Sequence, residues 1–144
     1  VACGAMLCRD EFAADLRPGM HASTFGGNSL AMAAGLAVGE TIEAEGLLDH
    51  VQQMERQVRT RLHQLQQQLP IIREIRTCGL MIGIELSIPA QPAVAKCMER
   101  GVLINATNET VVRLLPALNV PAADLLEGLD VVADVLEEMA SEAS

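Results

Sequence analysis

Residues 80–86, in the second part of the chain, read Leu-Met-Ile-Gly-Ile-Glu-Leu. Its large apolar residues alternate with methionine, glycine and glutamate, as expected of a β-strand with one face on a hydrophobic core. Residues 71–76 form another run rich in β-branched side chains, and Cys78-Gly79 separates the two runs. The sequence therefore predicts two consecutive short strands.

Helical patterns surround these strands. Apolar residues recur at steps of three and four over residues 47–69, and Pro70 ends the pattern, which predicts an amphipathic helix. A short helix is expected over residues 89–100, where Gly101 closes it. The last helix starts near Pro121 and carries an apolar stripe.

Two further strands complete the second part of the chain. Residues 102–104 and 110–115 are expected as strands around an Asn-Ala-Thr-Asn turn. Residues 47–144 can thus form a small sheet that is covered by helices on one side.

The first part of the chain cannot make a core alone. Residues 1–7 are apolar and predict a buried strand without a preceding turn, so we expect a piece of a longer protein. Residues 21–29 read as a loop rich in glycine and small polar residues. A helix with Ser29 as its N-cap follows, and Gly46 is expected to stop it. Its first half is apolar on all sides, which predicts burial in a larger structure.

The composition excludes several classes of protein. The net charge of −9, with only ten basic residues, argues against a nucleic-acid or acidic-membrane partner. No apolar run of membrane-spanning length and no secretion signal occur, so a cytoplasmic protein is expected. The cysteines form no Cys-x-x-Cys pair and have no histidine at zinc spacing, so we expect buried or half-buried free thiols and no metal site.

The loop before the Ser29 helix is a candidate anion site. Ser23 and Thr24 supply hydroxyl groups, and Gly26 and Gly27 let backbone N–H groups approach a ligand at a helix N-terminus. These are the components of a phosphate site. From the residues alone, an ordinary loop with a helix cap is at least as well supported.

Several charged or ionisable residues could take part in a site. Arg113 shares a strand face with apolar neighbours, which fits either a bidentate carboxylate clamp or an edge arginine that reaches water. Lys96 is the only lysine and lies in a surface helix, so we do not expect it to be a catalytic amine. His21, His50 and His63 are expected to be solvated surface residues.

Three ordered segments resemble one known family. The first segment begins at residue 21 and reads His-Ala-Ser-Thr-Phe-Gly-Gly-Asn-Ser-Leu-Ala. It resembles the H-x-S-T-[FY]-G-G-N-P-L-A segment of the class III, fold-type I aminotransferases of the acetylornithine and ornithine type. Residues 78–86 resemble the family's R-G-x-G-L-M-x-G-I-E-L hairpin. Residues 112–118 resemble its I-R-F-x-P-[PA]-L strand. Ser29 replaces the usual proline, a mild departure because serine can cap the same helix.

The resemblance implies an α/β fragment. Residues 1–46 would be the C-terminal end of the large pyridoxal-phosphate-binding domain, with an interface loop and a linking helix. Residues 47–144 would be the small C-terminal α+β domain, with a short, mainly antiparallel sheet covered by helices. The family's active sites lie at the interface of a homodimer.

The resemblance also implies the chemistry. The position of Thr24 binds the cofactor phosphate of the neighbouring subunit, that of Ser23 lies beside the substrate, and that of Arg113 binds a substrate carboxylate. The implied reaction moves an amino group from N-acetylornithine, or an ornithine-like amino acid, to 2-oxoglutarate, a step in arginine biosynthesis. The family's Schiff-base lysine would precede Val1, so the isolated chain is expected to be inactive and to hold no catalytic residue.

A second hypothesis belongs to another class of function. The chain would then be a non-catalytic α+β interaction module derived from this family. Its apolar helix over residues 29–38 would serve as a protein interface.

Overall fold

The computed structural model describes residues 2–143 and divides the chain into two compact units. The N-terminal unit ends at Glu45, and the C-terminal unit begins at Gly46. The C-terminal unit holds the sheet and its core.

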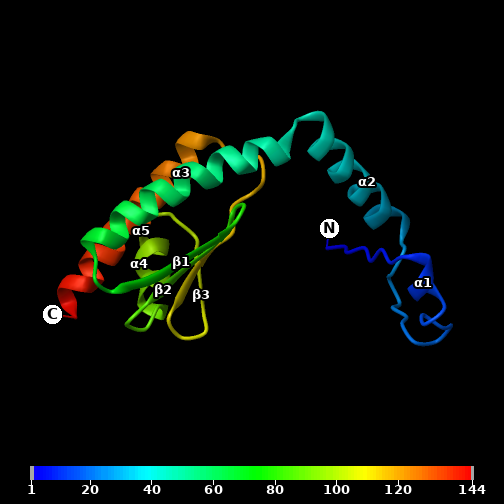
Figure 1. The fold of residues 1–144 in the computed structure, drawn as a ribbon, viewed down its shortest axis with the longest axis horizontal. Helices are drawn as coiled ribbons and strands as arrows, with labels where there is room; N and C mark the ends of the chain where they lie inside the picture. Colours follow the sequence, from blue (N-terminus) through cyan, green and yellow to red (C-terminus); the bar gives the residue numbers. More distant parts are fainter. Residues whose placement is uncertain (1, 144) are drawn as a thin grey trace. The chain divides into compact units, whose positions relative to one another are not determined.

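The sheet of the C-terminal unit has four strands in the order β1-β2-β4-β3, and every neighbouring pair is antiparallel (Figure 1). The strands are β1 (Ile72–Cys78), β2 (Met81–Leu86), β3 (Asn105–Thr107) and β4 (Val111–Leu114). The alternation predicted for residues 80–86 is confirmed, because Ile82, Ile84 and Leu86 are fully buried whereas Met81 is 57% exposed. One face of the sheet therefore packs on the core, and we call the other its open face.

Helices cover the core face of this sheet. They are α3 (Leu47–Gln68), α4 (Gln91–Glu99) and α5 (Ala122–Glu142), and Figure 1 shows α3 and α5 on the same side of the strands. The apolar stripe predicted for residues 47–69 is confirmed: Val58, Leu62 and Leu65 are at most 2% exposed. They share one hydrophobic core with the buried strand residues and with the stripe of α5.

The third strand differs from the prediction. Residues 102–104 are not a strand; β3 instead occupies Asn105–Thr107, inside the segment predicted as a turn. The reversal comes later, at Asn108 and Glu109, which both have positive φ. Asparagine tolerates this left-handed conformation, so the Asn-Ala-Thr-Asn signal was correct about a turn but its position within the segment was wrong.

The N-terminal unit contains α1 (Asp10–Ala13) and α2 (Ser29–Ala44). Asn28, not Ser29, is the N-cap of α2, because its Oδ1 accepts a hydrogen bond from the Ala31 N–H at 2.9 Å. The predicted stop is confirmed, since Gly46 follows the helix with a φ of 60°.

The prediction of a strand over residues 1–7 is wrong for residues 2–7, which are exposed and have no regular structure. Val1 lies outside the described residues. A strand requires a neighbour for its backbone hydrogen bonds, and the described part of this unit has no second strand to provide one. The segment passes α2 instead, with Cys3 Sγ 3.7 Å from the position a Cβ would take on Gly35.

The cysteines are free, as predicted, but their expected burial is wrong for all except one. Cys97 is buried, whereas Cys3, Cys8 and Cys78 are exposed. Burial raises the pKa of the Cys97 thiol. Among residues 2–143, no helix has the length and apolar character needed to cross a membrane.

Candidate functional site

The first candidate element is the loop that leads into α2. Residues 24–27 form a turn, and Gly27 has a φ of 71°. The Asn28 side chain closes the turn, because its Nδ2 donates to the Phe25 carbonyl at 2.7 Å while its Oδ1 caps the helix. The sequence thus fixes the loop locally, through one asparagine and one glycine in the left-handed region.

Ser23 and Thr24 are both exposed within this loop. A Cβ on residue 26 would lie 2.5 Å from Ser23 Oγ, so a side chain at this position would displace the serine hydroxyl from its present place. The capping asparagine occupies the N–H of Ala31 and leaves the preceding helical N–H groups without a helical acceptor. Hydroxyl groups and free N–H groups at the start of a 16-residue helix suit a phosphate.

The second candidate element is Arg113 on the open face of the sheet. β4 pairs Arg113 with Gly83 of β2, and β1 pairs Arg76 with the same glycine. A row therefore runs across the sheet from Arg76 through Gly83 to Arg113. A shallow hollow of about 290 Å³ on this face is lined by both arginines, Gly83 and Val111. Within residues 2–143, no carboxylate forms an ion pair with Arg113. Its guanidinium is thus available to an external carboxylate.

Acidic residues on the same face are held by other partners. Arg76 Nη2 donates to Glu85 Oε2 at 2.9 Å, Arg76 Nη1 pairs with Glu74, and Thr110 Oγ1 donates to Glu85 Oε1 at 2.6 Å. The hydrogen bond from Thr110, followed by that from Arg76, lowers the pKa of Glu85 below its ordinary value. Each oxygen of the Glu85 carboxylate therefore already has a partner.

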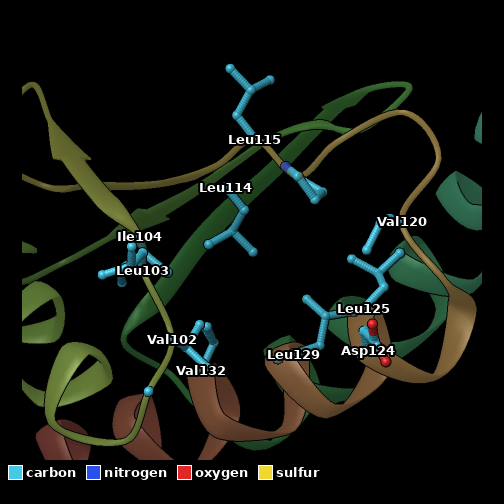
Figure 2. Close-up of a pocket in the computed structure, with 13 residues that line it drawn as sticks. Val102, Leu103, Ile104, Leu114, Leu115, Val120, Asp124, Leu125, Leu129 and Val132 are labelled. Atoms are coloured by element: carbon cyan, nitrogen blue, oxygen red, sulfur yellow. The ribbon is translucent and has the colours of Figure 1, made fainter.

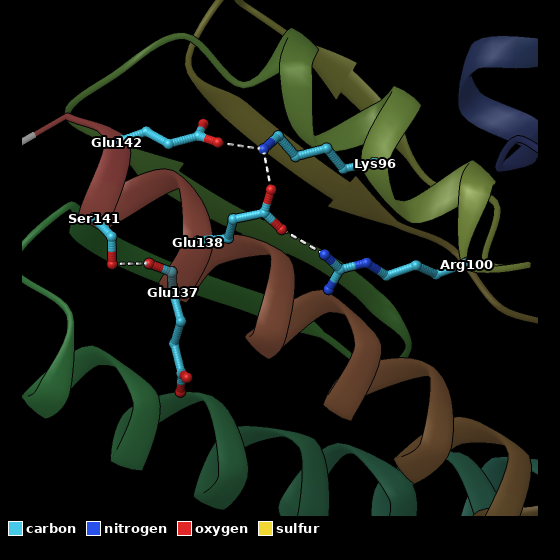
Figure 3. A network of polar contacts seen from close by, with 6 residues as sticks. All are labelled: Lys96, Arg100, Glu137, Glu138, Ser141 and Glu142. Carbon is cyan, nitrogen blue, oxygen red and sulfur yellow. Dashed lines mark hydrogen bonds and ion pairs between the residues drawn. The ribbon is translucent and has the colours of Figure 1, made fainter.

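Lys96 joins two helices through its ion pairs. Its Nζ donates to Glu142 at 2.8 Å and to Glu138, and Arg100 donates to Glu138 as well, so α4 is tied to α5 (Figure 3). The hydrogen bonds to Glu138 and then Glu142 raise the pKa of Lys96. A Schiff-base lysine needs a lowered pKa, so the sequence-based rejection of Lys96 agrees with its surroundings.

The three histidines differ in their exposure. His21 and His63 are exposed, as predicted. His50 is half-buried, and its Nε2 lies 2.9 Å from the Val120 carbonyl, so the prediction of a solvated side chain is wrong there. The apolar stripe of α3 gave no sign of this contact, because Val120 is 70 residues away in the sequence.

A second hollow, also about 290 Å³, lies between α5 and the segment that leads into β3 (Figure 2). Its walls are mostly apolar, with Leu114, Leu125 and Leu129 among them. Asp124 is the charged residue among those that line it. Such a lining would repel a carboxylate or phosphate, so we do not assign it to the site.

The structure places the predicted residues in two groups. Ser23 and Thr24 share one loop of the N-terminal unit, and Arg113 lies on the sheet of the C-terminal unit. Sequence patterns had not revealed Arg76 and Glu85 as neighbours of Arg113. The signal that could have found them is the register of the strands, which requires the pairing order β1-β2-β4.

Comparison with known proteins connects these groups to one family. The sequence profile of the family Aminotransferase class-III matches residues 1–136. The acetylornithine aminotransferase of Caldanaerobacter subterraneus subsp. tengcongensis is 39% identical over 137 residues, which are 94% of this chain and 35% of that relative. Acetylornithine aminotransferase 1 of Bordetella parapertussis is 47% identical over 118 residues, which cover 82% of this chain and 30% of the relative.

Solved structures show the same fold. The acetylornithine aminotransferase of Elizabethkingia anophelis matches 92% of this chain with a TM-score of 0.80 and 26% identity, and 34% of that structure is covered. The ornithine δ-aminotransferase of Plasmodium falciparum matches 94% with a TM-score of 0.84 and 25% identity, and 35% of it is covered. The chain thus spans about a third of the length of its relatives.

Proposed function

Because the chain belongs to the class-III aminotransferase family, we propose that it forms the C-terminal part of an enzyme that moves an amino group from N-acetylornithine to 2-oxoglutarate. The observation that carries this proposal is its similarity to acetylornithine aminotransferases over 94% of its length. A relative named ornithine aminotransferase, from rice, is 38% identical over 144 residues. The ornithine-like amino acids are therefore the competing donors.

The loop before α2 is proposed to hold the phosphate of pyridoxal 5′-phosphate. When bound, this cofactor supplies the electron sink that amino-group transfer requires. The Thr24 hydroxyl would donate to a phosphate oxygen, and the N–H groups at the start of α2 would face the same negative charge. Ser23, whose hydroxyl is positioned over Gly26, would lie beside the substrate. These residues bind and orient, which lowers the entropic part of the barrier.

Arg113 is proposed to hold a carboxylate of the substrate. Its side chain is exposed on the open face, lines a hollow, and is free of ion pairs with other described residues. A planar guanidinium can donate hydrogen bonds to both oxygens of one carboxylate and thereby fix the orientation of the substrate. Neither Arg113 nor Thr24 can transfer the proton between substrate and cofactor.

The amine that would carry this proton is proposed to lie outside these 144 residues, since Lys96 is committed to Glu138 and Glu142. We therefore expect the chain alone to be inactive. We also propose a cytoplasmic homodimer that acts in arginine biosynthesis, in which Thr24 serves the site of the neighbouring subunit. The exposed apolar side chains of α2, such as Leu30 and Leu36, support a subunit contact.

These exposed side chains also favour a second candidate function. A non-catalytic interaction module would use the same apolar surface of α2 without any cofactor. Size-exclusion chromatography of the chain distinguishes the two, because a monomer that captures no partner contradicts the module. Cofactor binding by the complete protein supports the enzyme.

Thr24→Val in the complete protein tests the phosphate contact. Loss of one hydrogen bond to a charged group predicts about tenfold weaker binding of pyridoxal 5′-phosphate, measured by absorbance titration. Thr41→Val is the matched control, because Thr41 Oγ1 donates only to the Ala37 carbonyl within α2. Equal affinities of the wild type and Thr24→Val would refute the contact.

A further inference from the structure

The open face of the sheet places two carboxylates directly opposite each other. Glu74 of β1 pairs with Glu85 of β2. Like charges in a direct cross-strand pair repel each other. Arg76 relieves this repulsion, because its guanidinium donates to Glu74 through Nη1 and to Glu85 through Nη2.

Glu85 is also a diagonal neighbour of Arg113. β2 and β4 pair Glu85 with Val111, and Arg113 lies two residues further along the same face of β4. Diagonal neighbours on a sheet lie within reach of long side chains. An ion pair between Glu85 and Arg113 is therefore compatible with the register, yet the structure does not form it.

The hydrogen bonds of Glu85 hold its carboxylate toward Arg76 and Thr110. Thr110 donates to Oε1 and Arg76 to Oε2, so both oxygens already have a charged or polar partner. Gly83 lies between the two arginines, and the position a Cβ would take there is 4.0 Å from Arg76 Nε. The Arg76 side chain therefore passes over the glycine toward Glu85.

We propose that Arg76 is a positioning residue that holds Glu85 away from Arg113 and so keeps Arg113 open to the carboxylate of the substrate. This inference rests on the proposed function, in which Arg113 binds that carboxylate. Without Arg76, Glu85 turns to Arg113 and competes with the substrate as an internal carboxylate. Arg76 itself does not touch the substrate.

The test compares Arg76→Met, Arg76→Met/Glu85→Gln and Arg76→Lys in the complete enzyme. Competition from an exposed ion pair predicts that Arg76→Met raises the KM for 2-oxoglutarate about fivefold with little change in kcat. The second substitution removes the competitor and is expected to restore the KM to within about twofold of the wild type. Arg76→Lys keeps a cation beside Glu85 and is expected to restore most of the affinity.

Arg61→Met is the matched control, because it removes an arginine from an exposed ion pair with Asp130, between α3 and α5. Its KM is expected to equal that of the wild type. Arg76→Met with an unchanged KM would overturn the proposal, and so would a double variant whose KM stays as high as that of Arg76→Met.

A readout without activity separates this proposal from the proposed function. Arg113→Met is introduced into the wild-type chain and into Arg76→Met, and urea unfolding is followed by circular dichroism. If the new Glu85–Arg113 pair forms, Arg113→Met lowers the urea midpoint more in the Arg76→Met background than in the wild-type chain. Adding Glu85→Gln to the Arg76→Met background then removes this extra decrease. Equal falls in both backgrounds overturn the inference even if the enzyme is active. A wild type without transaminase activity contradicts only the proposed function.

Discussion

Lys96 of α4 donates a hydrogen bond to Glu138 of α5, and this contact raises the pKa of the lysine while it lowers the pKa of the glutamate. Because the folded-state pKa of Glu138 is lowered, its ionised carboxylate stabilises the fold at pH values above its unfolded-state pKa of 4.5. This stabilisation is lost as the pH falls through the folded-state pKa. Because the folded-state pKa of Lys96 is raised, its charged amine stabilises the fold at pH values below its unfolded-state pKa of 10.5. This stabilisation is lost as the pH rises through the folded-state pKa.

Lys96→Met is therefore expected to lower the urea midpoint by a constant amount from about pH 6 to about pH 9. The difference from the wild type should shrink as the pH falls below about 4.5, because the unfolded chain binds a proton at Glu138 before the folded chain, whose Glu138 pKa is lowered, does so. Urea unfolding at a series of pH values measures this difference. A difference that persists unchanged into acid would show that the stabilisation does not come from the ion pair.

Two glycines are expected to respond oppositely to alanine. Gly79 has a φ of 58°, and a Cβ there would lie 2.8 Å from Val51 Cγ1, so Gly79→Ala should destabilise the chain by about 2 kcal/mol. Gly128 lies within α5 with no atom within 4 Å of the new Cβ, so Gly128→Ala should stabilise it by about 0.5–1 kcal/mol. Urea unfolding of the two variants gives both values, and shifts of the same sign would contradict the explanation.

The cap of α2 gives a local prediction. Asn28→Ala removes the acceptor of the Ala31 N–H and should cost about 1 kcal/mol of helix stability. Amide hydrogen exchange at Ala31 and Met32, whose N–H groups both donate to Asn28, measures this loss in the first turn. Ser29→Ala is the matched control, since Ser29 is not the cap. Faster exchange in that variant would mean that Ser29, and not Asn28, caps the helix.

The sequence was sufficient wherever a strong periodic pattern met a clear stop. The helix before Pro70 and the alternating strand of residues 80–86 were predicted because one face of each packs on the core. The predictions failed where the structure of a segment depends on which groups it contacts. Asn28 and Ser29 are both good helix caps, and only the hydrogen bond in the folded chain shows that Asn28 is the cap. Residues 2–7 have strand-like composition, but composition cannot supply a neighbouring strand.

The candidate site shows the same division. Arg113 was singled out because a charge on an apolar strand face demands a partner. Its relationship to Arg76 and Glu85 could not be predicted, because it depends on β4 pairing with β2 across the intervening α4 and β3. Long-range register of this kind is set by the packed core rather than by local propensity.

We propose above that this chain supplies the carboxylate-binding arginine, Arg113, of an acetylornithine aminotransferase. The most direct measurement is glutamate formation from N-acetylornithine and 2-oxoglutarate by the complete protein and by Arg113→Gln. We predict turnover by the wild type and a kcat/KM about 30-fold lower in the variant, as for loss of a charged hydrogen-bonded contact. No glutamate from the wild type, or equal kcat/KM in the two proteins, would contradict the claim.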